Sequence, residues 1–255
     1  MVNTVDYKYG FVINVIDNGS TDGSKDYLRS LPQDWPVKAH CLGRNLGVSG
    51  GRNFGMSLTA GKSNTFYWSN DNDMVPLKKN WITRIIEASM AQPIVRLISY
   101  PMFGANDYAR LEIKDCNGFK LAEVDPLWLG GYLMGIPPMT FKKIGYFDFE
   151  HSRDSYLSQY TQERVLFGVE DTLYAHRVKL AGGKIYYMEE PGMFQNIQRD
   201  ILEPVNPERK PSDRTKTTNS QYENFKHTEL ERIEKERLFE RLCEAYSSCE
   251  KPLKI

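Results

Sequence analysis

Strand-like and helix-like segments alternate along the first hundred residues, and this alternation constrains the fold more than any other feature of the sequence. Apolar runs such as FVINVI read as buried strands, and turn-rich stretches and helical patterns separate them. Such alternation is typical of α/β proteins with a largely parallel sheet. We expect strands at 11–16, 37–42, 65–69 and 94–100, and helices at 25–31, 51–60 and 81–90.

Two polar segments come directly after predicted strands. DNGSTDGS begins at Asp17, and NDND spans residues 70–73. Ligands of parallel α/β sheets bind beyond the carboxyl ends of the strands, so both segments lie at the edge where a ligand site is expected. DNGSTDGS also supplies small residues that let a ligand approach the backbone.

Asp71 and Asp73 are two carboxylates, two residues apart, at the end of an apolar strand. Such a pair is self-repelling unless a cation or a hydrogen-bond donor compensates its charge. Oxygen ligands suit Mg²⁺ or Mn²⁺, which also bind substrate phosphates. On the triplet alone, a simple turn in which Asp or Asn caps the next helix is the stronger interpretation.

Two further segments favour a ligand site. GRNLGVSGGRNFGM, residues 43–56, combines glycines with Arg44 and Arg52, which suits a loop and helix start near phosphate. GVEDTLYAHR places Glu170 and Asp171 at the start of a predicted helix. Carboxylates there either stabilise the helix dipole or act as a general base.

The chain resembles the family 2 glycosyltransferases of the GT-A fold over roughly residues 11–190. The resemblance rests on segments that follow the family's order: DNGSTDGS, NLGVSGGRNFGM, a strand ending in DND, LGGYLMGI with FKKIGYFD, and GVEDTLYAHRVKLAGGKIYYM. It implies a GT-A-like (Rossmann-like), mostly parallel sheet flanked by helices. It also implies a nucleotide-sugar donor, expected to be a UDP-sugar, a divalent cation (Mn²⁺ or Mg²⁺) and inversion at the anomeric carbon.

The resemblance also implies roles for individual residues. Asp171 matches the catalytic base, with Glu170 as its neighbour, and Asp73 is the favoured direct metal ligand beside Asp71. A late histidine completes the metal shell in some GT-A enzymes, and His227 is the candidate here. The donor side would be formed by Asp17, Gly19, Ser20, Arg52, Asn53, Asp71 and Arg177, and the acceptor side by Trp128, Gly130, Gly131 and Tyr132.

The chain departs from the family pattern before DNGSTD. The family normally opens with a further strand and helix, and that strand end helps to hold the nucleotide base. Only sixteen residues precede Asp17. Either the chain starts late, or Met1–Gly10 covers the gap differently, or another chain supplies the element.

Composition excludes several classes of protein. Lys and Arg number 33, as do Asp and Glu, so nothing drives the whole chain toward nucleic acid or an anionic membrane. The four cysteines form no CxxC pair, which favours reduced thiols in a cytoplasmic protein over a structural zinc site. The sequence shows neither a secretory signal nor a run of the ~20 apolar residues that a membrane span needs.

The sequence divides into a glycosyltransferase domain at 1–195 and an extension at 196–255. The extension opens with a stretch rich in Pro, Lys, Arg, Ser and Thr, which reads as a loop or arm. Apolar residues then recur at helical spacing between 226 and 246. We expect this helix to pack on the body or on a partner, which includes a second copy in a homo-oligomer.

Two other functions fit the same residues. A nucleotidyltransferase on a similar scaffold also uses paired carboxylates, and a non-catalytic subunit could bind a nucleotide-sugar without turnover. GVED beside LGGYLMG favours glycosyl transfer over nucleotidyl transfer. The acceptor stays open among a glycan, a protein, a lipid-linked sugar and a modified nucleic-acid base.

Overall fold

The computed structural model describes residues 4–5, 8–59, 64–91, 96–101, 110–126, 129–147, 170–190 and 193–196. Each helix and strand expected in the first hundred residues is present, with ends that differ by a few residues. These elements are β1 (Ile13–Asp17), α1 (Ser24–Arg29), β2 (Val37–Cys41), α2 (Gly47–Ser57), β3 (Tyr67–Asn70), α3 (Trp81–Met90) and β5 (Arg96–Ser99). The short strand β4 (Met74–Pro76) was not expected. The later ones are β6 (Arg110–Cys116), β7 (Phe119–Val124), β8 (Leu133–Ile136), α4 (Pro138–Ile144), α6 (Glu170–Leu180), β9 (Lys184–Met188) and β10 (Phe194–Asn196).

The main sheet has six strands within the described residues, in the order β3-β8-β5-β9-β7-β6. β5 and β9 are parallel, as are β1 and β2, which form a separate pair. The other strand pairs of the main sheet are antiparallel. The α/β class is therefore confirmed, but the expectation of a mostly parallel sheet is corrected to a mixed sheet.

The change of strand direction has a local cause in the β6–β7 hairpin. Asn117 and Gly118 join the two strands, and both have positive φ, 55° and 84°. A two-residue turn of this kind connects only antiparallel neighbours, whereas parallel strands need a long crossover. The helix–strand alternation of the first hundred residues does not extend into this part of the chain.

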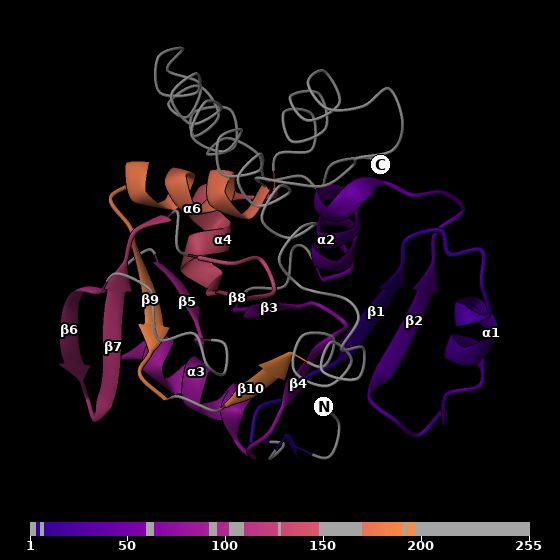
Figure 1. The fold of residues 1–255 in the computed structure, drawn as a ribbon, viewed down its shortest axis with the longest axis horizontal. Coiled ribbons are helices and arrows are strands. Elements are labelled where there is room, and N and C mark those ends of the chain that lie inside the picture. Colours follow the sequence, from indigo (N-terminus) through magenta and orange to yellow (C-terminus); the bar gives the residue numbers. More distant parts are fainter. Residues whose placement is uncertain are drawn as a thin grey trace, which may run out of the picture.

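Helices cover both faces of the sheet, as Figure 1 shows with α4 and α6 on one side and α3 on the other. Alternate residues of a strand point to opposite faces, and β5 follows this rule. Leu97 belongs to the apolar cluster beneath α4 and α6, and Ile98 to the cluster beneath α3. Trp81, Ile85 and Ala88 form the buried stripe of α3. The layered core holds the strand ends, and therefore the polar loops that follow them, in fixed positions.

The start of the chain packs against α3. Val5 is buried in the apolar cluster beneath that helix, and the Thr4 carbonyl accepts a hydrogen bond from the Asn80 amide over 3.1 Å. Among the described residues of Met1–Gly10, none forms a strand. These residues stabilise the helix start and do not supply an additional strand beside β1.

Several expectations concern residues outside the described ranges. They include the roles of Trp128 and His227 and the arm and helix expected after residue 196. No helix within the described ranges is both long and apolar enough to cross a bilayer.

Candidate active site

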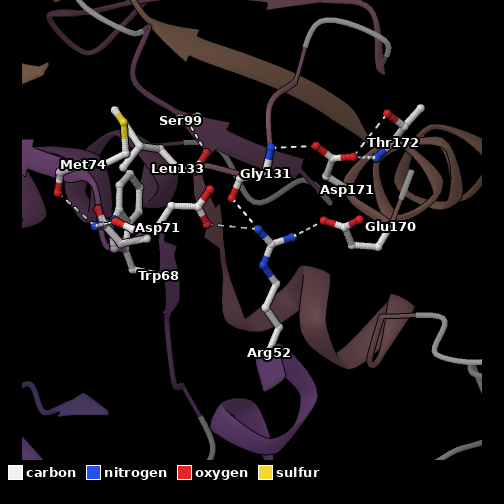
Figure 2. Close-up of polar contacts among 11 residues, drawn as sticks. Arg52, Trp68, Asp71, Met74, Ser99, Gly131, Leu133, Glu170, Asp171 and Thr172 are labelled. Carbon is white, nitrogen blue, oxygen red and sulfur yellow. Dashed lines mark hydrogen bonds and ion pairs between the residues drawn. The ribbon is translucent and has the colours of Figure 1, made fainter. Parts of the chain in front are cut away.

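The backbone at Gly131 and Tyr132, just before β8, joins three distant parts of the chain (Figure 2). The Tyr132 carbonyl accepts a 3.0 Å hydrogen bond from the Asp71 amide. The Gly131 carbonyl accepts from Arg52 Nη2 over 2.8 Å, and the Gly131 amide donates to Asp171 Oδ2 over 2.7 Å. One two-residue stretch therefore positions Asp71, the arginine of α2 and the expected base.

Strand register explains how these segments meet. β3 and β8 are antiparallel, and Asn70 at the end of β3 pairs with Leu133 at the start of β8. The residue after β3 must then lie beside the residue before β8, which brings Asp71 to Tyr132. α6 begins at Glu170, so its first turn carries Asp171 to the same place.

Arg52 lies between carboxylates of different elements, as Figure 2 shows. Its Nη1 donates to Glu170 Oε1 over 2.8 Å, and its Nη2 forms a 3.4 Å ion pair with Asp71 Oδ1. The guanidinium also lies over the ring of Phe147, 5.4 Å from the centroid. Only 11% of the Arg52 side chain is exposed, so solvent screens these charges poorly.

Asp171 uses both carboxylate oxygens. Oδ2 accepts from the Gly131 amide, while Oδ1 accepts from the Thr172 amide at 2.7 Å and the Thr172 hydroxyl at 3.3 Å. The first turn of a helix also favours a negative charge. These donors fix the orientation of the carboxylate, which still has lone pairs free to accept a further hydrogen bond.

The two glycines of LGGY are required by close contacts. A Cβ on Gly130 would lie 2.0 Å from the ring of Tyr132, and a Cβ on Gly131 would lie 2.8 Å from Arg52 Nη2. Two residues expected on the acceptor side, Gly130 and Gly131, thus lie directly against Tyr132 and Arg52. Tyr132 folds over Gly130, and its hydroxyl is 3.2 Å from that of Tyr187.

The turn after β3 presents Asp71 toward Arg52. Asn70 shapes this turn, because its Nδ2 donates to the carbonyls of Asp71 and Met74 over 2.6 Å and 3.1 Å. Partial burial raises the pKa of Asp71, and the charges of Asp73 and Asp171 raise it further, against the opposing effect of Arg52. About half of the Asp71 side chain, 48%, remains exposed and open to a ligand.

The residues present can fit a divalent cation only together with other ligands. Within the described ranges, no three His, Cys, Asp or Glu side chains gather closely enough to hold a metal ion. Asp71 and Asp73 offer hard carboxylate oxygens, and the pKa of Asp71 is raised chiefly by burial, which Arg52 does not fully offset. Mg²⁺-type sites commonly combine one or two carboxylates with water and substrate phosphate, which this pair can satisfy.

The DNGS turn holds a buried carboxylate with a free oxygen. Asp17 is 5% exposed; its Oδ1 accepts from the Ser20 amide over 3.1 Å, while its buried Oδ2 has no hydrogen-bond partner in the part of the chain that the structure describes. Gly19 makes the turn possible, because its φ is 86°. A Cβ at this position would lie only 2.7 Å from the carbonyl carbon of Arg44. A buried carboxylate oxygen without a partner is unusual in folded proteins, which singles out Asp17 in this turn.

Asn18 joins this turn to the loop before α2. Its Oδ1 accepts from the Leu46 amide over 2.9 Å, and its Nδ2 donates to the Gly47 carbonyl over 2.9 Å. The two glycine-containing motifs expected on the donor side therefore lie side by side.

Two residues expected to bind the donor have other partners. Asn53 is buried, and its amide exchanges two 2.8 Å hydrogen bonds with the backbone of Phe147. Arg177 is fully buried and donates to the carbonyls of Tyr146, over 2.7 Å, and Ile144. Both side chains hold the segment that follows α4, so their contacts give a donor-binding role no support.

Helix geometry gives the reason. Successive residues of a helix point about 100° apart, so Asn53 faces the core where Arg52 faces the site. Arg177 lies almost two turns beyond Asp171 in α6, away from the cluster at the helix start. Sequence reasoning also missed Phe147 beneath Arg52 and the pairing of Arg52 with Glu170, although their opposite charges were a signal that could have suggested it.

Comparisons with known proteins agree with this architecture. Residues 3–112 match the sequence model described as Glycosyl transferase family 2. The structure resembles one described as "Crystal structure of GalNAc-T7 with UDP, GalNAc and Mn2+", with a TM-score of 0.50 and 14% sequence identity. The match covers 72% of this chain and 37% of that one. No curated protein sequence matches the chain. The chain therefore has the GT-A glycosyltransferase fold, and residues 3–112 carry the family 2 match.

Proposed function

We propose that the protein is a metal-dependent glycosyltransferase that moves a sugar from a nucleotide-diphosphate donor to an acceptor hydroxyl with inversion. One observation carries the proposal: Asp71 and Asp171 are both hydrogen-bonded to the backbone of Gly131–Tyr132. A carboxylate suited to a cation and a carboxylate suited to proton transfer therefore share one site. The family 2 match supports glycosyl transfer, and the GalNAc-T7 structure holds UDP and Mn²⁺.

Asp171 is the general base of this proposal. It takes the proton of the acceptor hydroxyl as the hydroxyl oxygen attacks the anomeric carbon. The bond to the diphosphate breaks on the opposite side of the sugar, so a single displacement inverts the configuration. Gly131 and Thr172 hold the carboxylate in one orientation throughout, which favours attack from one direction.

Asp71 and Asp73 would hold the cation, whose chemistry is to neutralise the charge that develops on the leaving diphosphate. Arg52 keeps Asp71 and the Glu170–Asp171 pair at a fixed separation. Asp17 would receive a donor N–H or O–H of the nucleotide on its free Oδ2. A UDP-sugar is the expected donor, since UDP is the nucleotide in the similar structure.

The test combines nucleotide binding with donor turnover. Calorimetry with UDP, GDP and dTDP, with and without Mn²⁺, measures metal-dependent binding, and nucleotide release from the matching nucleotide-sugars measures turnover. We expect Asp171→Asn to lower turnover at least ~100-fold while leaving nucleotide affinity within twofold. Asp26→Asn, at an exposed position of α1, is the matched control.

Each alternative function has its own outcome in this test. Tight metal-dependent nucleotide binding without turnover, across a panel of acceptors, would favour a non-catalytic nucleotide-sugar-binding subunit. Transfer of the nucleotide itself would favour a nucleotidyltransferase. Absence of metal-dependent binding of every nucleotide would overturn the proposal.

A further inference from the structure

The three polar contacts of the Arg52 side chain differ in length and in environment. The contacts with Glu170 and with the Gly131 carbonyl are both 2.8 Å, and Glu170 is 5% exposed. The contact with Asp71 is 3.4 Å, and 48% of that side chain is exposed. Figure 2 shows the guanidinium between the two carboxylates. Arg52 is therefore anchored on the Glu170 side, and Asp71 is its weakest partner.

The guanidinium has little freedom to leave this position. Phe147 lies beneath it, and the missing Cβ of Gly131 provides the space that it occupies. Helix α2 carries Arg52, and the Asn53–Phe147 hydrogen bonds attach α2 to the segment after α4. A fixed positive charge consequently lies 3.4 Å from a carboxylate that is proposed to bind a cation.

A cation that binds Asp71 meets two obstacles. It must share the Asp71 carboxylate with Arg52, whose Nη2 pairs with Oδ1, and it must remain within a few ångströms of the guanidinium charge. Even at the full dielectric of water, repulsion between a divalent ion and a single positive charge about 6 Å away lowers the affinity on the order of tenfold. A nucleotide diphosphate supplies negative charge and further oxygen ligands, which offset this repulsion.

We infer that Arg52 is a built-in competitor for the divalent cation at Asp71, and that it makes cation binding depend on the donor diphosphate. The inference rests on the proposed function, because it requires a cation at Asp71 and Asp73. The cation alone then binds weakly, and the cation and the diphosphate strengthen each other's binding by the same factor. Arg52 is a positioning residue whose charge sets that factor.

The test measures Mn²⁺ affinity without turnover, by electron paramagnetic resonance of the free ion. In the absence of nucleotide, we expect Arg52→Met to bind Mn²⁺ about tenfold more tightly than the parent protein. Arg52→Lys retains the charge and should stay within about twofold to threefold of the parent. Arg84→Met is the matched control, because it removes an arginine of α3 that pairs with Glu190. It should leave the Mn²⁺ affinity unchanged.

The same titrations with saturating UDP measure the coupling. We expect the ratio of Mn²⁺ affinities with and without UDP to fall about tenfold in Arg52→Met and to stay near the parent value in Arg84→Met. Unchanged or weaker Mn²⁺ binding by Arg52→Met, with normal binding by the parent, would overturn this inference alone. Equal changes in Arg52→Met and Arg52→Lys would also overturn it, because charge would then not be the cause.

Failure of the proposed function looks different. If the parent protein binds no Mn²⁺ with or without UDP, GDP or dTDP, the metal site and the inference fall together. If Arg52→Met does not fold, Glu170→Gln replaces it in the test. That change removes the stronger anchor and leaves Arg52 freer to pair with Asp71, so Mn²⁺ affinity should fall, and an unchanged affinity would contradict the competition.

Discussion

The amide of Gly131 donates a 2.7 Å hydrogen bond to Asp171. A side chain at Gly131 would not remove this bond directly, but its Cβ would lie 2.8 Å and 2.9 Å from the two Arg52 Nη atoms and 3.1 Å from the Asp171 Cβ. We expect Gly131→Ala to displace Arg52 and misplace the base, lowering turnover on the order of 10- to 100-fold. Stability should fall by about 1–3 kcal/mol, because the added methyl group overpacks a site whose guanidinium has little freedom to move aside.

Donor turnover and thermal unfolding of Gly131→Ala check this expectation together. Gly10→Ala is the control, since nothing lies within 4 Å of a Cβ at that position. Turnover of Gly131→Ala within twofold of the parent would contradict the role given to the Arg52–Gly131–Asp171 arrangement.

The turn at Gly19 is predicted to support nucleotide binding. Its φ of 86° disfavours a side chain, and a Cβ would lie 2.7 Å from backbone that cannot rotate away. We expect Gly19→Ala to cost about 2 kcal/mol of stability and to weaken UDP binding, because the turn presents Asp17. Gly23→Ala in the same loop has nothing within 4 Å and should change neither quantity. Normal UDP affinity in a destabilised Gly19→Ala would separate the turn from the nucleotide site.

Arg177 is predicted to act in stability and not in catalysis. Arg177→Met leaves the buried carbonyls of Ile144 and Tyr146 without their donors, which should cost about 3 kcal/mol in denaturant unfolding. Turnover per folded molecule should remain near that of the parent protein. Arg29→Met, at an exposed position of α1, should change stability by less than about 0.5 kcal/mol. A large loss of UDP affinity without loss of stability would instead support the assignment of Arg177 to donor binding.

Local signals were enough to predict most helices and strands of the first hundred residues and to single out Asp71 and Asp171 as candidate site residues. Asp71 and Asp171 both contact the Gly131–Tyr132 backbone. Asp71 comes directly after a predicted strand and Asp171 lies at the start of a predicted helix, and both features are visible as short motifs. The LGGY glycines were expected near the acceptor, and their contacts with Tyr132 and Arg52 explain why no larger residue fits.

Residues that depend on distant packing could not be predicted in the same way. In α6, buried side chains point in most directions, so periodicity does not reveal that Arg177 faces the core. Its partners near residue 145 become neighbours only through the tertiary fold. The β6–β7 hairpin was missed although the sequence signals it, because Leu111 and Ile113 alternate with charged residues ahead of the Asn117-Gly118 turn.

Asp71 gives a prediction for the pH dependence of stability. Partial burial, assisted by Asp73 and Asp171, raises its pKa above the ordinary value of 3.8. The folded protein therefore binds a proton at Asp71 more readily than the unfolded chain does. The contribution of Asp71 to the free energy of unfolding is therefore fully present at low pH. It is lost as pH rises from about 4 through the raised pKa.

Asp71→Asn removes this ionisation and should be more stable than the parent protein at pH 7 without metal. The advantage should shrink as pH falls toward 4, because the parent carboxyl then becomes neutral as well. Mn²⁺ with UDP should raise the melting temperature of the parent more than that of Asp71→Asn, since the cation compensates the carboxylate that the variant lacks. Melting temperatures between pH 4 and 7, with and without Mn²⁺ and UDP, measure both effects. Asp26→Asn, whose side chain is 86% exposed, should show neither effect, and a parent protein that gains stability over Asp71→Asn as pH rises would reverse the sign argued for Asp71.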